Sequence, residues 1–139
     1  MLYNAIRSLC ARAGWKEPNA DEKGVYAFNL EGDYSFTLSS PDGERLLARA
    51  ALLVPGAGQK IAGDTLEEVM RITVARFAKL QSVVALDPES GALEIHAFTS
   101  LRDAGMDAHE TFLANFLNEL SFWQAQPALS APTALNADT

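Results

Sequence analysis

The chain has 139 residues, of which 48% are hydrophobic and 21% charged, so it has room for one domain with one hydrophobic core. Its formal net charge of −7 lies entirely in residues 81–139, and an acidic half disfavours nucleic acid and anionic membranes as partners. No run reaches the roughly 20 apolar residues of a bilayer-spanning helix, and the lone Cys10 excludes an intramolecular disulfide and suits a reducing cytoplasm.

The N-terminal part of the chain predicts one helix and then three strands. Apolar residues recur at intervals of four, three and four, the stripe of an amphipathic helix that ends at Gly14: Leu2, Ile6, Leu9 and Ala13. Residues 25–30 are rich in β-formers, and residues 34–39 alternate between aromatic or aliphatic and hydroxyl side chains. A third strand is expected over residues 44–54. Short turns between the three strands predict an antiparallel meander.

The C-terminal part predicts a helix, two strands and a last helix. We expect a helix over residues 64–80, a short strand over 83–86, an antiparallel return over 92–100 and a helix over 107–124. After Gln124 the composition changes to Ala, Pro and a single charge, so residues 125–139 are expected to form a disordered tail.

Both long C-terminal helices begin with a capping-box pattern. Asp64 is followed three residues later by Glu67, and Asp107 by Glu110, a spacing in which the two side chains cap each other's backbone. The sequence therefore predicts an α+β fold of order α-β-β-β-α-β-β-α, with a twisted antiparallel sheet packed against three helices in one domain, residues 1–124.

Motifs for catalysis, metal binding or cofactor binding are missing from the sequence. Gly58 and Gly63 have the spacing of a phosphate-binding loop, but Asp64 stands where that loop needs lysine and would repel phosphate. The two histidines do not have ligand spacing, so His96 is interpreted as lying on the less apolar face of its strand and His109 as a solvated helix-start residue. We therefore expect no enzyme activity, no metal and no cofactor. Cys10 is expected to be a small core thiol.

Three segments together resemble a known family of protein-binding proteins. They are the strand from Gly24 to Leu30, the hairpin from Ala85 to Leu93, and the end of the last helix from Leu117 to Trp123. With the element order, size and acidity, they make residues 2–124 similar to the class I chaperones of bacterial type III secretion, the Tir-chaperone family. The resemblance implies a cytoplasmic homodimer that holds the N-terminal segment of a secreted effector in an extended form, without nucleotide or metal.

The resemblance also nominates residues for two surfaces. The second helix and the strand after it would form the dimer contact, through Val69, Met70, Thr73, Phe77, Val84 and Leu86. Effector binding is assigned to apolar positions of the first helix and the meander: Leu2, Ile6, Leu9, Phe28, Phe36, Leu38 and Leu47. Each of these residues has core packing as its alternative role. Ile72 and Val74 leave the second helix with more apolar surface than one small domain can bury, which favours a partner.

Two other functions remain open at this point. A regulatory chaperone of the same fold would bind a transcription-control protein in place of an exported effector, and only the identity of the guest separates the two. A small enzyme or ligand carrier would instead have a pocket lined by Trp15, Tyr26, Phe28 and Tyr34.

Overall fold

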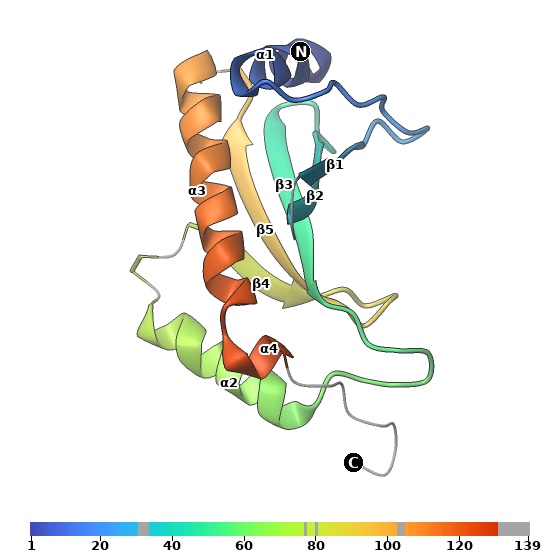
Figure 1. Cartoon of the computed structure of the whole chain (residues 1–139), viewed down its shortest axis with the longest axis vertical. Coiled ribbons are helices and arrows are strands. Elements are labelled where there is room, and N and C mark those ends of the chain that lie inside the picture. The colour runs from blue at the N-terminus through green and yellow to red at the C-terminus, as the bar shows by residue number, and fades with distance from the viewer. Residues whose placement is uncertain (31–33, 77, 80, 103–104, 131–139) are drawn as a thin grey trace.

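The helices and strands follow the predicted order (Figure 1). The computed structural model describes residues 1–30, 34–76, 78–79, 81–102 and 105–130. Its elements are α1 (Leu2–Ala13), β1 (Tyr26–Leu30), β2 (Tyr34–Ser39), β3 (Arg45–Leu53), α2 (Gly63–Ala75), β4 (Val83–Leu86), β5 (Leu93–Ser100), α3 (Met106–Gln124) and α4 (Pro127–Ser130). The α+β fold class predicted from the sequence is confirmed, and none of the described helices is long and apolar enough to cross a membrane.

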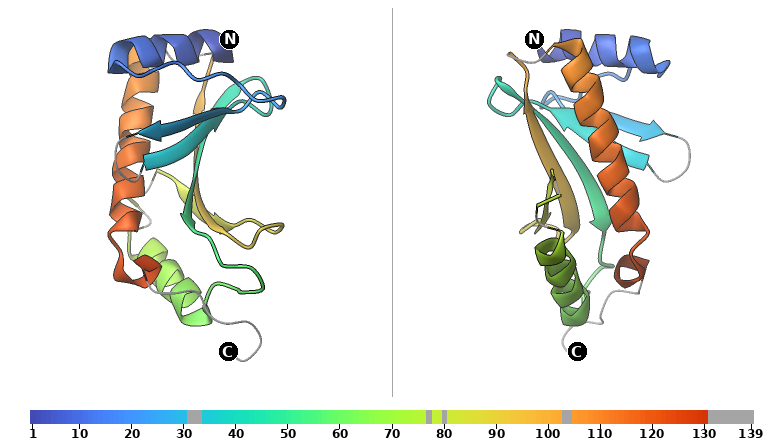
Figure 2. Two further views of the ribbon diagram at one scale, coloured as in Figure 1. Left: turned by 45° about the vertical axis from the view of Figure 1, so that its right-hand side comes forward. Right: turned by 90° about the vertical axis from the view of Figure 1, so that its left-hand side faces the viewer.

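The strands form one antiparallel sheet in the order β1-β2-β3-β5-β4. Both α1 and α3 lie on one face of this sheet, and α2 lies beyond its far end, next to α4 (Figure 2). No described helix covers the other face, which we call the outer face. The period-2 alternation of the strands therefore decides which side chains are buried under α3 and which stay accessible.

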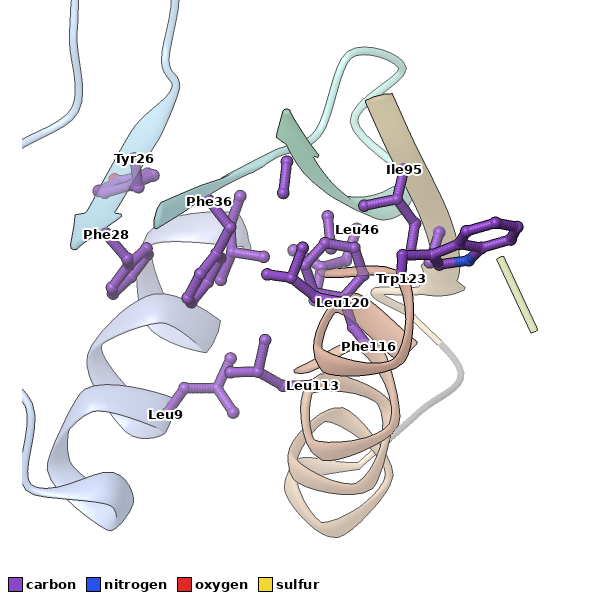
Figure 3. Close-up of a cluster of buried hydrophobic side chains, with 14 of the residues drawn as sticks. Leu9, Tyr26, Phe28, Phe36, Leu46, Ile95, Leu113, Phe116, Leu120 and Trp123 are labelled. Carbon is purple, nitrogen blue, oxygen red and sulfur yellow. The ribbon is translucent and has the colours of Figure 1, made fainter. Parts of the chain in front are cut away.

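The core lies between the sheet and α3 (Figure 3). From α3, Phe116, Leu120 and Trp123 are at most 2% exposed, because a spacing of three and four residues places them on one face of the helix. They meet the inward-facing strand residues, and Phe36 packs edge-on against Phe116 with ring centroids 6.0 Å apart. Phe28 lies opposite Phe36 in the register and stacks on it at 5.1 Å. This aromatic row extends the core from α3 to the edge strand β1.

The ends of the first helix are as predicted, but those of the other two long helices differ. Gly14 ends α1 with φ +75°, a left-handed conformation that glycine adopts without strain. The N-caps of α2 and α3 are Ala62 and Gly105, and neither helix has a side-chain cap bond, so both predicted capping boxes are wrong. Asp107 instead accepts a hydrogen bond of 2.8 Å from Arg12, which joins the end of α1 to the start of α3.

Two predicted segments have different extents in the structure. Helix α2 ends at Ala75 and not at residue 80; Phe77 and Leu80 lie outside the described residues. Within the predicted tail, Pro127–Ser130 form α4, and Leu129 is buried against the core cluster. Residues 131–139 lie outside the described residues, so disorder of the tail and the domain boundary at residue 124 stay predictions.

Leu120 provides a test of this core. Replacing Leu120 with alanine should lower the free energy of unfolding by about 3 kcal/mol, because a fully buried leucine leaves a cavity under the sheet. Urea denaturation measures this change. The exposed Asn118→Ala on the same helix is the control and should change the free energy by less than about 0.5 kcal/mol. Equal effects of the two substitutions would contradict the packing described above.

Candidate protein-binding surfaces

Five large apolar side chains are exposed on α2, β4 and β5. Their exposed fractions run from 47% to 77%, and they are Met70, Val74, Val83, Leu86 and Phe98. We call them the apolar end of the molecule. Several large apolar side chains left exposed on neighbouring parts of a fold are typical of surface that another protein covers.

Helix α2 supplies two of these five side chains. Of its 13 residues only Thr65 and Val69 are buried, while Met70 and Val74 lie one turn apart on the opposite side. Helix α2 packs mainly against the short α4. A helix with so little buried area gains most of its stability from whatever covers its other face.

Strands β4 and β5 supply the rest. Inward-facing Leu93, Ile95 and Ala97 are at most 5% exposed. Phe98, which follows Ala97, therefore faces outward and is half exposed, with the Arg45 guanidinium 4.7 Å from its ring centroid. A cavity of about 540 Å³ lies beside Phe98, bordered by Thr73, Val83 and Val84. The apolar end is therefore hollowed and not flat.

The structure brings part of the predicted dimer contact to this end. Met70 and Leu86 are exposed, Thr73 and Val84 are partly buried, and Val69 is 5% exposed with its carbonyl accepting the Thr73 hydroxyl at 2.8 Å. Phe77 lies outside the described residues.

The prediction from sequence missed Val83 and Phe98. The alternation of side chains along β5 could have predicted Phe98. If Leu93, Ile95 and Ala97 point inward, Phe98 must point outward. Val83 faces the same way, since it pairs with outward His96 in the register.

The predicted effector-binding residues are mostly part of the core. Five of them are at most 6% exposed: Ile6, Leu9, Phe28, Phe36 and Leu38. Leu2 and Leu47 are partly exposed, the first on α1 and the second on the outer face of β3. Whether this set binds a guest is not decided by burial in the free protein, and it stays a prediction.

A small apolar hollow lies between the end of α1 and α3. Its volume is about 150 Å³, and its walls include Leu9, Trp15, Leu113 and Leu117. The side chains of Leu9 and Leu113 point toward one another in Figure 3, and Trp15 packs with its ring centroid 5.8 Å from that of Phe28. Close to this hollow, Arg12 near the end of α1 donates a hydrogen bond to Asp107 at the start of α3. This hydrogen bond raises the pKa of the Arg12 guanidinium.

The four residues of the ligand-carrier alternative do not share one role. Tyr26 and Phe28 are buried in the core, and Trp15 packs against the Phe28 ring from outside. The Tyr34 hydroxyl lies 2.5 Å from the Ser121 hydroxyl and fastens β2 to α3. Packing explains the positions of Trp15, Tyr26 and Phe28, and the hydrogen bond to Ser121 explains that of Tyr34.

The outer face carries a charged network centred on Glu94. Arg49 donates two hydrogen bonds to the Glu94 carboxylate, from Nε at 2.9 Å and Nη2 at 2.8 Å, and His96 Nε2 lies 3.0 Å from the same group. Burial acts to raise the pKa of Glu94, but the hydrogen bonds and charges of Arg49 and His96 outweigh it, so the pKa is lowered. The carboxylate is therefore held ionised at neutral pH.

The two histidines and the cysteine have structural environments. His96 lies on the less apolar face of its strand, as predicted. The prediction for His109 is wrong: it is 4% exposed and its Nε2 lies 2.9 Å from the Ser100 carbonyl, because the first turn of α3 packs onto the end of β5. Cys10 is buried as predicted, and burial raises the pKa of its thiol. Among the described residues no three His, Cys, Asp or Glu side chains are grouped to hold a metal ion.

Comparisons with known proteins identify the fold. The family model described as "Tir chaperone protein (CesT) family" matches residues 4–124. A chain of the ExsC–ExsE complex is 19% identical, with a TM-score of 0.67 over 88% of this chain and 90% of that one. A chain of the HopA1–SchA chaperone–effector complex is 14% identical, with a TM-score of 0.69 over 88% and 92%. No curated protein sequence matches the chain.

One further solved structure has the same fold. A chain from the complex of the Yersinia pestis type III secretion chaperone SycH with a stable fragment of YscM2 is 14% identical. Its TM-score is 0.61 over 88% of this chain and 99% of that chain. The relatives are thus matched over nearly their whole length, and the sheet and helices described above are common to them.

The Glu94 network predicts a pH dependence of stability. Glu94→Gln should lower the free energy of unfolding at pH 7 by about 2 kcal/mol, because it replaces a charged acceptor of two Arg49 hydrogen bonds. A lowered folded-state pKa means that the contribution of Glu94 is present above its ordinary value of 4.5 and is lost as the pH falls through the folded value.

Urea denaturation of both proteins between pH 7 and pH 3 measures this dependence. The difference in free energy of unfolding between the wild type and Glu94→Gln should become smaller below pH 4.5, which is the ordinary pKa of a glutamate. Glu89→Gln, at an exposed position in the β4–β5 turn, is the control and should show no gap. A gap that stays constant over this range would show that Glu94 contributes through its shape and not through its charge.

Proposed function

The chain belongs to the Tir chaperone protein (CesT) family, and we propose that it is a cytoplasmic type III secretion chaperone. It would bind the N-terminal region of a secreted effector in an extended form and keep that effector competent for export. The observation that carries the proposal is the family match across residues 4–124, on a chain whose apolar end is exposed.

The apolar end is proposed to be the homodimer contact. A second copy placed against Met70, Val74, Val83, Leu86 and Phe98 would bury side chains that are 47% to 77% exposed in the single chain. It would also cover the side of α2 that the protomer leaves open. The partly exposed Thr73 and Val84 border the same surface, while Val69 supports it from below.

The guest is proposed to bind α1 and the β-meander. Leu2 and Leu47 offer accessible apolar surface there, and the buried Ile6, Leu9, Phe28, Phe36 and Leu38 hold that surface from beneath. Strand β1 is an edge strand that pairs with β2 alone among the described strands. An extended guest segment can add to such an edge through main-chain hydrogen bonds.

Charge contributes to the choice of guest. The net charge of −7 favours guests with basic segments, mainly by speeding their encounter with the chaperone. Association should therefore slow as salt is added, because screening shortens the reach of the attraction.

Two solved structures with the same fold support the proposal, because each contains a chaperone with a bound protein. The HopA1–SchA pair is a chaperone–effector complex, and SycH is a type III secretion chaperone with a bound protein fragment. A regulatory chaperone whose guest controls transcription would have the same fold, so the identity of the guest decides between the two functions. The family is a chaperone family, and we infer that the chain has no catalytic activity of its own.

Co-expression with the products of the neighbouring genes tests the function. We expect one of them to co-purify with this chain through its N-terminal region. A secreted effector as guest supports the export role, and a transcription regulator supports the regulatory one. If purification instead yields the chain alone, with a small molecule bound, the chaperone proposal is wrong.

The dimer contact is tested by Met70→Glu. A carboxylate on the apolar end should weaken self-association by about 30-fold, or about 2 kcal/mol, because it would be buried without a partner. Sedimentation equilibrium at micromolar concentration measures this. The control is Val54→Glu, which changes a similarly exposed valine outside the surface. A wild-type monomer would contradict the assignment.

The guest surface is tested at the start of α1. Leu2→Glu should weaken binding of the co-purified guest about tenfold, because it places charge in partly buried apolar surface. Isothermal titration calorimetry measures the affinity. Asn4→Glu adds the same charge at an exposed position of the same helix and should have little effect. Equal affinities for both variants would remove α1 from the guest site.

A further inference from the structure

The sheet splits between β2 and β3. Strand β2 pairs with β3 over three positions only, Thr37↔Arg49 to Ser39↔Leu47. On either side of this junction the pairing is longer: β1 follows β2 over its whole length, and β3 follows β5 from Arg45 to Leu53. The β1–β2 hairpin consequently swings away from β3 and β5, as both views of Figure 2 show. Two paired half-sheets thus diverge from a short shared stretch.

A cavity of about 540 Å³ occupies the split, and we call it the cleft. One wall comes from the hairpin and includes Asn29, Ser35 and Thr37, and the other includes Arg49 and Ala51 from β3. Its floor includes Phe36, which is 3% exposed. Val25 and Phe28 also line the cleft, so small and polar side chains stand beside apolar ones there.

Main-chain groups of both strands face this cleft. The Leu101 amide bonds the Glu44 carbonyl at 2.8 Å, so that pair is hydrogen-bonded across β5 and β3. In an antiparallel sheet the hydrogen-bonded pairs alternate, so even-numbered residues of β3 bond β5 and odd-numbered ones point toward β2. By this alternation the N–H and C=O groups of Ala51, and those of Ser35 on β2, point toward the cleft beyond the last β2–β3 pair.

We propose that the cleft accepts a further extended stretch of the guest chain, which pairs as a strand with the open edge of β3 at Ala51. This proposal rests on the function proposed above and adds a second place of attachment to it. Successive guest side chains would point alternately to the floor and to the outer face. The site thus selects an alternating segment, with apolar residues over Phe36 and polar residues beside Arg49.

Arg49 supplies a polar contact for that segment. Its Nε and Nη2 are held by Glu94, which fixes the plane of the guanidinium. Its Nη1 has no partner among the described residues, and the side chain is 43% exposed at the cleft wall. A guest carbonyl or carboxylate can accept from Nη1 without breaking the pair with Glu94.

A guest segment fits the cleft better than a second copy of this chain. The exposed apolar side chains suited to self-association lie on α2, β4 and β5, at the opposite end of the strand order. The cleft instead combines small side chains on Ala51, Ser35 and Thr37 with main-chain groups that point into it. An extended chain satisfies such groups, whereas a folded surface does not.

Site-specific photocross-linking tests the proposal. The probes are the N-terminal fragments of the proteins encoded beside this chain's gene. The photoreactive residue p-benzoylphenylalanine replaces either Ala51 or Ala85, two exposed alanines that flank Glu94 in the register on opposite sides. Only Ala51 lines the cleft. We expect a cross-link to the fragment from position 51 and none from position 85.

Affinity gives a second readout. Ala51→Trp should weaken fragment binding about tenfold by filling the cleft, while Ala85→Trp should leave it within twofold. A fragment that binds the wild type but shows neither the cross-link nor the selective loss overturns the cleft proposal and leaves the chaperone function standing. If none of the fragments binds the wild type, the chaperone function itself is overturned.

Discussion

The packing of α3 across one face of the sheet is the interaction on which the rest of the structure depends. Phe116, Leu120 and Trp123 are almost completely buried and contact strands from both halves of the sheet. Helix α1 adds four residues to the same core, Ala5, Ile6, Leu9 and Cys10, whereas α2 adds Val69. The outer face and the open side of α2 stay accessible because no further element among the described residues covers them.

The apolar end and the cleft between β2 and β3 differ in chemistry, and we infer a different partner for each from this difference. The apolar end offers large aliphatic and aromatic side chains, which suit a permanent contact between folded copies. The split between β2 and β3 offers main-chain groups and small side chains, which suit an extended chain. The Arg49–Glu94 pair lies between the two regions and fixes the wall of the cleft. A protein that must hold a client unfolded needs both kinds of surface.

Periodicity in the sequence was sufficient for the elements and their order, because single-face burial leaves a clear pattern along each of them. It failed where tertiary contacts override local signals. Asp107 has the position of a cap but bonds Arg12, which is close only once α1 has packed beside α3. His109 looks like a solvated helix-start residue but is covered by the end of β5. The split beyond Thr37 has no sequence signal, since it depends on how strongly each half-sheet twists.

Native mass spectrometry of the chain co-expressed with its guest fragment tests the central claim most directly. The account predicts a complex with two copies of this chain and one extended fragment, and a dimer of the chain alone. A chain that stays monomeric, or that binds no fragment, would contradict the account.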